Sequence, residues 1–198
     1  MANANRPMGL SPVKTITGAP YNGQARVYAI LAADTNGYAI GDPVASVAGG
    51  GDASGNAAIT IGVAGAAIRG VIVGLADRKD AFVKVGNLDS IVRPAAAQST
   101  DWYALVVDDP TVIFEIQEVN SGTPLAAADI GLNANFVAGA NNGFYSGFTL
   151  DNATELGTAT LNLKILELVQ RADNEIGAAA KWLVKINNHE FNTGTAGV

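Results

Sequence analysis

Short runs of alternating apolar and polar residues, separated by turns rich in glycine and asparagine, follow one another along most of the chain. Alternation with a period of two residues predicts half-buried β-strands. The clearest run, residues 111–117, is rich in the β-branched and aromatic side chains that strands favour. Asn-Gly pairs at 22–23 and 36–37 are typical of tight turns. We expect strands at residues 24–30, 44–48, 57–62, 67–73, 81–85, 91–93, 102–107, 111–117, 132–137 and 182–186.

Three further segments complete the predicted fold. Residues 159–169 fit either a strand or one face of a helix, and the preceding Thr-Ala-Thr-Leu-Asn favours the strand. Residues 123–131 predict one short helix that begins at the N-cap Thr123 and ends before Gly131. Residues 49–55 read Gly-Gly-Gly-Asp-Ala-Ser-Gly and predict a flexible loop. The whole pattern predicts an all-β fold, a jelly-roll-like sandwich or barrel of short antiparallel strands with at most one short helix.

The first twenty residues differ from the rest of the chain because they hold three of its seven prolines. Proline fixes φ and removes a hydrogen-bond donor, so residues 1–20 predict an extended N-terminal arm. Residues 21–198 then form a single β-rich domain, for which an internal division near 95–101 is the alternative. We expect the arm to contact neighbouring subunits, and its deletion through residue 16 to leave a folded protein. The contact residues that we expect are Arg6, Met8, Leu10, Val13 and Ile16.

Composition excludes several kinds of site. The absence of cysteine excludes disulfides and thiolate chemistry, and a single histidine excludes metal sites built from several histidines. A net charge of −6 without a basic patch argues against nucleic-acid binding. The longest apolar stretch, residues 63–76, is broken by glycines and an arginine, so we expect no membrane contact. The N-terminus has no signal-peptide pattern, so we expect synthesis and assembly in a host cytoplasm.

The remaining candidate residues give no catalytic constellation. Asp108 and Asp109 in a turn leave a calcium site as an alternative to a structural role. Glu115 and Glu118 are three residues apart on an expected strand and so fall on opposite faces. We expect His189 to be a surface or hydrogen-bonded histidine near a strand end. We therefore expect a protein that is not an enzyme, with no catalytic residue, no cofactor and no metal.

Aromatic residues offer two structural roles and one binding role. The side chains of Phe144, Tyr145 and Phe148 lie close in sequence beside glycines. They predict core packing or a subunit contact, and a sugar-stacking platform is the alternative. Both tryptophans, Trp102 and Trp182, are expected in the core.

Three long segments of the chain resemble structural proteins of tailed bacteriophages. They are MANANRPMGLSPVKTITGAPYNGQARVY at the start, WYALVVDDPTVIFEIQE with LAAADIGLNANFVAG after it, and TLNLKILELVQRADNEIGAAAKWLVKINNHEF near the end. The family that they resemble decorates or cements the virion head. The resemblance spans nearly the whole chain and rests on general sequence texture.

The resemblance implies a role on the outside of the capsid. It implies a β-rich protein, often a homotrimer, that binds and bridges neighbouring subunits of the major capsid protein. Another phage component (tail, fibre or head closure) is one alternative, and a carbohydrate-binding β-sandwich is another.

Overall fold

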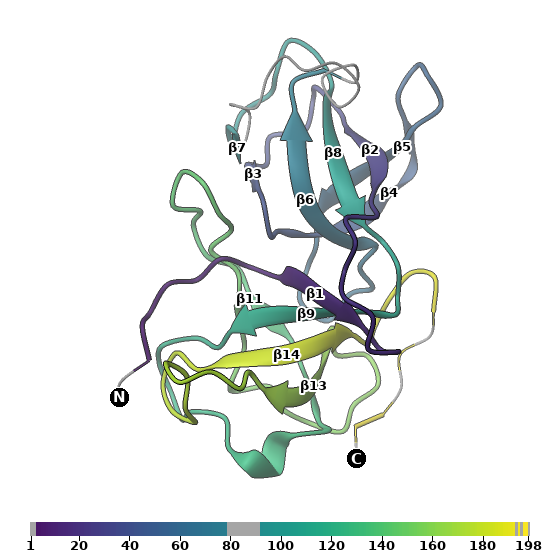
Figure 1. Cartoon of the computed structure of the whole chain (residues 1–198). Coiled ribbons are helices and arrows are strands. Elements are labelled where there is room, and N and C mark those ends of the chain that lie inside the picture. Colours follow the sequence, from purple (N-terminus) through teal and green to yellow (C-terminus); the bar gives the residue numbers. More distant parts are fainter. Residues whose placement is uncertain (1–2, 79–91, 193, 195, 198) are drawn as a thin grey trace.

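The computed structural model describes residues 3–78, 92–192, 194, 196 and 197, and within them the protein is almost entirely β-structure. The predicted all-β class is therefore confirmed (Figure 1). The expected strand at 81–85 and residue 91 lie outside the described residues. The strands are β1 Ser11–Thr15, β2 Arg26–Ile30, β3 Tyr38–Ala39, β4 Pro43–Gly51, β5 Ala57–Ile61, β6 Gly70–Ala76, β7 Val92–Arg93, β8 Trp102–Val107, β9 Val112–Gln117, β10 Asn133–Ala134, β11 Phe136–Val137, β12 Thr149–Leu150, β13 Leu163–Leu168 and β14 Lys181–Ile186.

Five strands close into a small barrel, in the order β2-β5-β4-β6-β8 with β8 returning to β2. All of its pairs are antiparallel except β2 with β5. Closure leaves no open sheet edge, because every strand has two neighbours. The barrel encloses its own apolar core, whose fully buried members include Tyr38, Val44, Ile72 and Val106.

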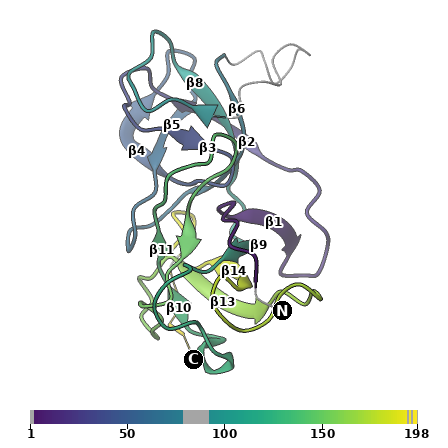
Figure 2. The same cartoon turned by 90° about the vertical axis from the view of Figure 1, so that its left-hand side faces the viewer.

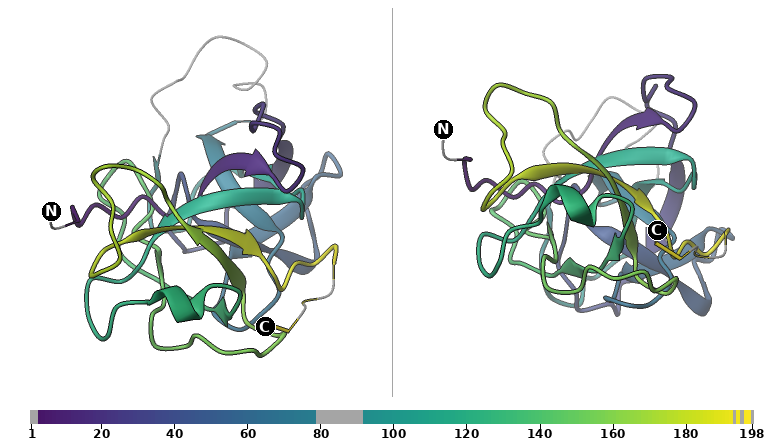
Figure 3. Two further views of the ribbon diagram at one scale, coloured as in Figure 1. Left: turned by 60° about the horizontal axis from the view of Figure 1, so that its bottom comes forward. Right: turned by 90° about the horizontal axis from the view of Figure 1, so that it is seen from below.

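Five other strands form an open sheet in the order β1-β9-β14-β13-β10. In Figure 1 this sheet lies below the barrel, and Figure 3 shows β1, β9 and β14 side by side from beneath. One sheet face packs against a large core that contains Phe114 and Trp182. Val71 and Val107 of the barrel, and Ile68 in the connection before β6, belong to the same core. Barrel and sheet are therefore joined by shared apolar packing.

The N-terminal segment is extended, but it is built into the sheet. Strand β1 pairs with β9 along its length (Figure 2). Leu10 is buried in the shared core. The outer edge of β1 is covered by its own following turn, where the N–H of Tyr21 donates to the carbonyl of Val13 at 2.9 Å. This cover and Pro12 leave little of the edge open to pairing with another chain. Removal of residues 1–16 would delete a strand and a core residue, which argues against the expectation that the rest of the chain folds without them.

The path between the two parts also differs from the expected division near 95–101. The chain first passes from β1 in the sheet to β2 in the barrel through residues 16–25, and it leaves the barrel after β8 and enters the sheet again at β9 through residues 108–111. It returns to the barrel at the C-terminus, where Ile68 and His189 form an isolated parallel bridge. Residues 95–101 instead connect β7 to β8.

Several local predictions are confirmed and others are wrong. Strand β8 has the predicted bounds, and residues 163–168 form a strand rather than a helix. The predicted helix at 123–131 is only a 3₁₀ turn, η2 (Ala127–Asp129), because the backbone is still extended at Ala126, with φ −110° and ψ 172°. Residues 49–51 belong to β4 rather than to a loop, and the positive φ of Gly49 accommodates the irregularity that lets Gly51 pair with Ala57.

Candidate functional site

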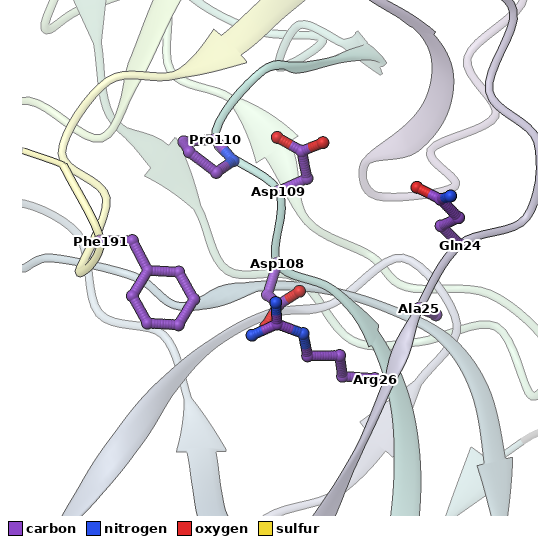
Figure 4. Close-up of a pocket in the computed structure, with 7 residues that line it drawn as sticks. All are labelled: Gln24, Ala25, Arg26, Asp108, Asp109, Pro110 and Phe191. Carbon is purple, nitrogen blue, oxygen red and sulfur yellow. The ribbon is translucent and has the colours of Figure 1, made fainter.

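An open cleft of about 450 Å³ lies where the barrel meets the sheet. We call it the junction cleft. Three chain segments that are far apart in sequence build it: the start of β2, the crossing between β8 and β9, and the segment after β14 (Figure 4). Its size falls within the range of small-molecule sites, which are commonly 300–1,000 Å³. The lining residues are Gln24, Ala25, Arg26, Asp108, Asp109, Pro110 and Phe191.

The floor of the cleft is the carboxylate of Asp108, which has a hydrogen-bond donor and a counter-ion within the protein. Asp108 is buried, its Oδ2 accepts the Tyr28 hydroxyl at 2.6 Å, and the same oxygen lies 3.3 Å from Nη1 of Arg26. Burial, and then the hydrogen bond to Asp108, raise the pKa of Tyr28 to about 12. Tyr28 is therefore a fixed donor over the whole physiological pH range, and the charge of Asp108 is balanced by Arg26.

Asp109 points away from its neighbour into the turn. Its Oδ1 accepts the N–H and the hydroxyl of Thr111, both at 2.8 Å, which is an Asx turn. Its Oδ2 remains open to the cleft among the described residues. Because adjacent carboxylates diverge in this way, they do not build a calcium site together. In the described part of the chain, no group of three or more His, Asp or Glu could hold a metal ion.

Phe191 forms the wall opposite Gln24 and is 51% exposed. The guanidinium of Arg69 lies 4.1 Å from its ring centroid, a close cation–π contact. Nε of Arg69 is 2.8 Å from Oε2 of Glu190, and both oxygens of Glu190 also accept from Ser46 at 2.6 Å. This network fixes the segment after β14 to the barrel and holds the Phe191 ring in place.

His189 supports Phe191 from below and takes no exposed position. Its side chain is buried, its Nδ1 accepts the N–H of Phe191 at 3.0 Å, and the two rings stack at 5.6 Å. Burial, and then the positive charge of Arg69, lower the pKa of His189. The expected hydrogen-bonded histidine near a strand end is confirmed, and the neutral ring acts as part of the packing.

A second junction lies on the other side of the molecule, where three segments meet closely. The N–H of Leu10 donates to the carbonyl of Gly41 at 2.9 Å, and the N–H of Ser146 donates to the carbonyl of Ile40 at 2.8 Å. A Cβ on Gly9 would lie only 2.3 Å from the carbonyl oxygen of Gly41, so this approach requires glycine.

Exposed apolar side chains flank this contact. Met8 precedes Gly9 and is 40% exposed, while Phe144 and Tyr145 precede Ser146 and are 60% and 42% exposed. We call these three residues the arm platform. Phe148 belongs elsewhere, because it is buried and meets Phe136 edge to face at 5.3 Å. The predicted aromatic cluster is therefore divided between core and surface.

The other predicted contact residues are dispersed. Arg6 is exposed, and its backbone N–H donates to the side chain of Gln117 at 2.7 Å. Val13 and Ile16 are exposed on β1 and just after it, whereas Leu10 is buried. The structure brings Met8, but not Val13 or Ile16, to the arm platform. Trp182 is fully buried as predicted, and Trp102 is half-buried against the barrel core.

Glu115 of β9 and Glu118, the residue that follows β9, lie on opposite sides of the sheet, as predicted. Glu115 pairs with Arg171 at 3.1 Å and Lys181 at 3.6 Å on the outer face. Glu118 is buried at the core end of the strand, where its Oε2 accepts the indole N–H of Trp182 at 3.0 Å. Burial raises the pKa of Glu118 to about 6.

Sequence reasoning missed Gln24, Arg26 and Phe191 as site residues. None of them stands in a local motif, because the cleft arises only when residues 24–26, 108–110 and 191 meet in space. The one available signal was Asp108-Asp109-Pro110, which was interpreted as a turn.

Comparison with known proteins gives no family assignment. No protein-family model, curated protein or solved structure matches the chain. Among the described residues, none forms a helix that is long and apolar enough to cross a membrane.

Proposed function

We propose that this protein is a structural virion protein that decorates the outside of a phage capsid and bridges neighbouring subunits of the major capsid protein. The observation that carries the proposal is the arm platform. Met8, Phe144 and Tyr145 are large apolar side chains that remain exposed on a closely packed backbone. Aromatic residues and methionine are enriched at protein interfaces, so this surface is suited to binding another protein.

The closely packed junction gives such a surface a defined shape. The backbone beside Met8 cannot shift without separating Gly9 from Gly41 and Ser146. An interface that is ordered before binding loses less conformational entropy on association. Contacts of modest area can then hold, provided that one oligomer, in our proposal a homotrimer, engages several capsid subunits at once.

The test is occupancy on purified capsids that lack this protein. We expect the wild type to bind, and Met8→Asp and Phe144→Asp each to weaken binding at least tenfold while leaving the circular dichroism spectrum unchanged. Ile130→Asp is the matched control, since Ile130 is 41% exposed but follows η2, away from the arm platform. Equal occupancy for wild type and both arm-platform variants would overturn the proposed interface.

Stoichiometry separates decoration from the alternative virion roles. A shell-decorating protein is present in hundreds of copies per particle, and a tail or head-closure component in a dozen or fewer. Quantitative mass spectrometry of virions measures this number, and a dozen copies or fewer would contradict decoration.

A further inference from the structure

The junction cleft presents one aromatic wall and several polar groups that the protein itself leaves unused. The guanidiniums of Arg69 and Arg26 lie 4.1 Å and 5.9 Å from the centroid of the Phe191 ring, yet Phe191 stays half exposed where it lines the cleft. The exposed part of an aromatic ring that neighbouring side chains hold in place can stack against a ligand.

The polar groups around that ring include both donors and acceptors. Within the described residues the Gln24 side-chain amide makes no hydrogen bond, which leaves a donor and an acceptor. Asp109 uses only Oδ1 in its turn, so Oδ2 is a second acceptor. Nε and Nη2 of Arg26 have no ion-pair partner in the same part of the chain, so they add donors.

Charge decides which ligands fit the cleft. Its ionised side chains are Arg26, Asp108 and Asp109, which sum to −1, so an anionic ligand is repelled. A cation would be attracted by Asp109 but would also be repelled by the guanidinium of Arg26, and by that of Arg69 behind Phe191, so neither sign of charge is clearly favoured. A wholly apolar ligand would leave Asp109 and Gln24 desolvated without partners. A neutral molecule with an apolar face and several hydroxyl groups meets all of these conditions.

We propose that the junction cleft binds a neutral sugar, with one ring face stacked on Phe191 and its hydroxyl groups hydrogen-bonded to Gln24, Arg26 and Asp109. The cavity of about 450 Å³ accommodates one or two sugar rings. This site is separate from the arm platform, and it gives a capsid-bound protein a means of attaching to surfaces that carry glycans.

The experiment is a glycan array, followed by isothermal titration calorimetry with glucose, galactose, mannose, N-acetylglucosamine and their short oligomers. We expect at least one neutral sugar to bind with a dissociation constant on the order of 1 mM, and glucuronic acid to bind more weakly. Phe191→Leu keeps apolar contact with Arg69 but removes the aromatic ring, and it should weaken binding at least tenfold.

Three further variants make the assignment specific. Asp109→Asn preserves the acceptor for Thr111 and replaces Oδ2. Gln24→Ala removes a side chain that makes no hydrogen bond to the described part of the chain. Each variant should weaken binding at least threefold. Phe144→Leu is the control for an exposed phenylalanine outside the cleft and should leave affinity unchanged. If Phe191→Leu fails to fold, Gln24→Ala and Asp109→Asn still decide the question.

Three outcomes would overturn the proposal. The first is that no neutral sugar binds at concentrations on the order of tens of millimolar. The second is preferential binding of glucuronic acid. The third is binding that Phe144→Leu weakens while the three cleft variants do not. The first two outcomes do not bear on capsid occupancy, and occupancy is measured separately for the third, so failure here is distinguishable from failure of the proposed virion role.

Discussion

The indole N–H of Trp182 donates to Oε2 of Glu118 across two neighbouring strands, at 3.0 Å and within the core. The same oxygen accepts the backbone N–H of Leu125 at 3.2 Å, while Oε1 is buried without a hydrogen-bond partner. A carboxylate in this position is stable when protonated and costly when charged. The contact therefore makes folding stability depend on pH.

Replacing Glu118 with glutamine should remove this pH dependence. Burial raises the pKa of Glu118 from 4.5 to about 6 in the folded protein. Its favourable contribution is therefore fully present below pH 4.5 and lost as the pH rises through 6, a change of about 2 kcal/mol. Glu118→Gln should thus gain about 2 kcal/mol relative to wild type between pH 4.5 and pH 8, measured by urea unfolding.

Two features keep this measurement specific. The lowered pKa of His189 acts in the opposite direction. Its contribution to stability is fully present above about pH 6.5, and it is lost as the pH falls and the buried ring becomes protonated. That contribution is common to both proteins and cancels in the difference. Glu167→Gln, at an exposed position paired with Lys14, is the control and should follow the wild-type profile within about 0.5 kcal/mol. A parallel profile for Glu118→Gln would contradict the prediction.

The close approach of Gly9 to Gly41 should not tolerate a side chain. Gly9 has φ +66°, and a Cβ there would lie 2.3 Å from the carbonyl oxygen of Gly41 and 2.5 Å from Cβ of Ser146. Gly9→Ala should lower the free energy of unfolding by more than about 2 kcal/mol. Gly18 has φ +90° with no atom within 4 Å of its Cβ position, so Gly18→Ala reports backbone strain alone, about 1 kcal/mol. Equal losses would show that the three-segment contact does not form.

Deleting residues 1–16 should abolish folding. The deletion removes β1 and Leu10, and it exposes the edge of β9, which is a site for aggregation. Deleting residues 1–7 is the control, because it removes hydrogen bonds such as the one from Arg6 to Gln117 but leaves Leu10 and β1 in place. Circular dichroism and thermal melting distinguish the two. A cooperative transition in the longer deletion would show that β1 is dispensable.

Glu190 should contribute more than an ordinary surface carboxylate. It is one partner of a largely buried ion pair with Arg69 and accepts two hydrogen bonds from Ser46. Glu190→Gln should cost about 2–3 kcal/mol, because Arg69 would lose its counter-ion in a partly buried site. Hydrogen exchange should increase in residues 187–192, which the network fixes to the barrel. Glu167→Gln breaks an exposed pair and should cost less than about 1 kcal/mol.

The pattern of apolar, β-branched and aromatic residues along the chain predicted most of the long strands. Strands β8, β9 and β14 are rich in the β-branched and aromatic side chains that strands favour, and they are largely buried on both faces, between different cores. Alternation with a period of two residues predicted the strand at 163–168 and the opposite orientation of Glu115 and Glu118.

Where tertiary contacts override local preference, the prediction failed. Residues 132–137 are divided between β10 and β11, which belong to different sheets. The segment after Thr123 forms only the short η2, and the backbone is still extended at Ala126. Proline content predicted that residues 1–20 are extended, but pairing with β9 depends on a strand a hundred residues away.

The sequence by itself determined the all-β class, most strand positions and the absence of thiol chemistry, because each of these depends on residue type or on neighbours one or two positions away. Only the tertiary structure decided the barrel closure, the two junctions and the cleft. Asp108 is an ordinary turn residue until Tyr28 and Arg26 reach it, and Phe191 is an ordinary exposed ring until Arg69 fixes it. These contacts join segments that are separated by 80 residues or more along the chain, and no local pattern encodes such distances.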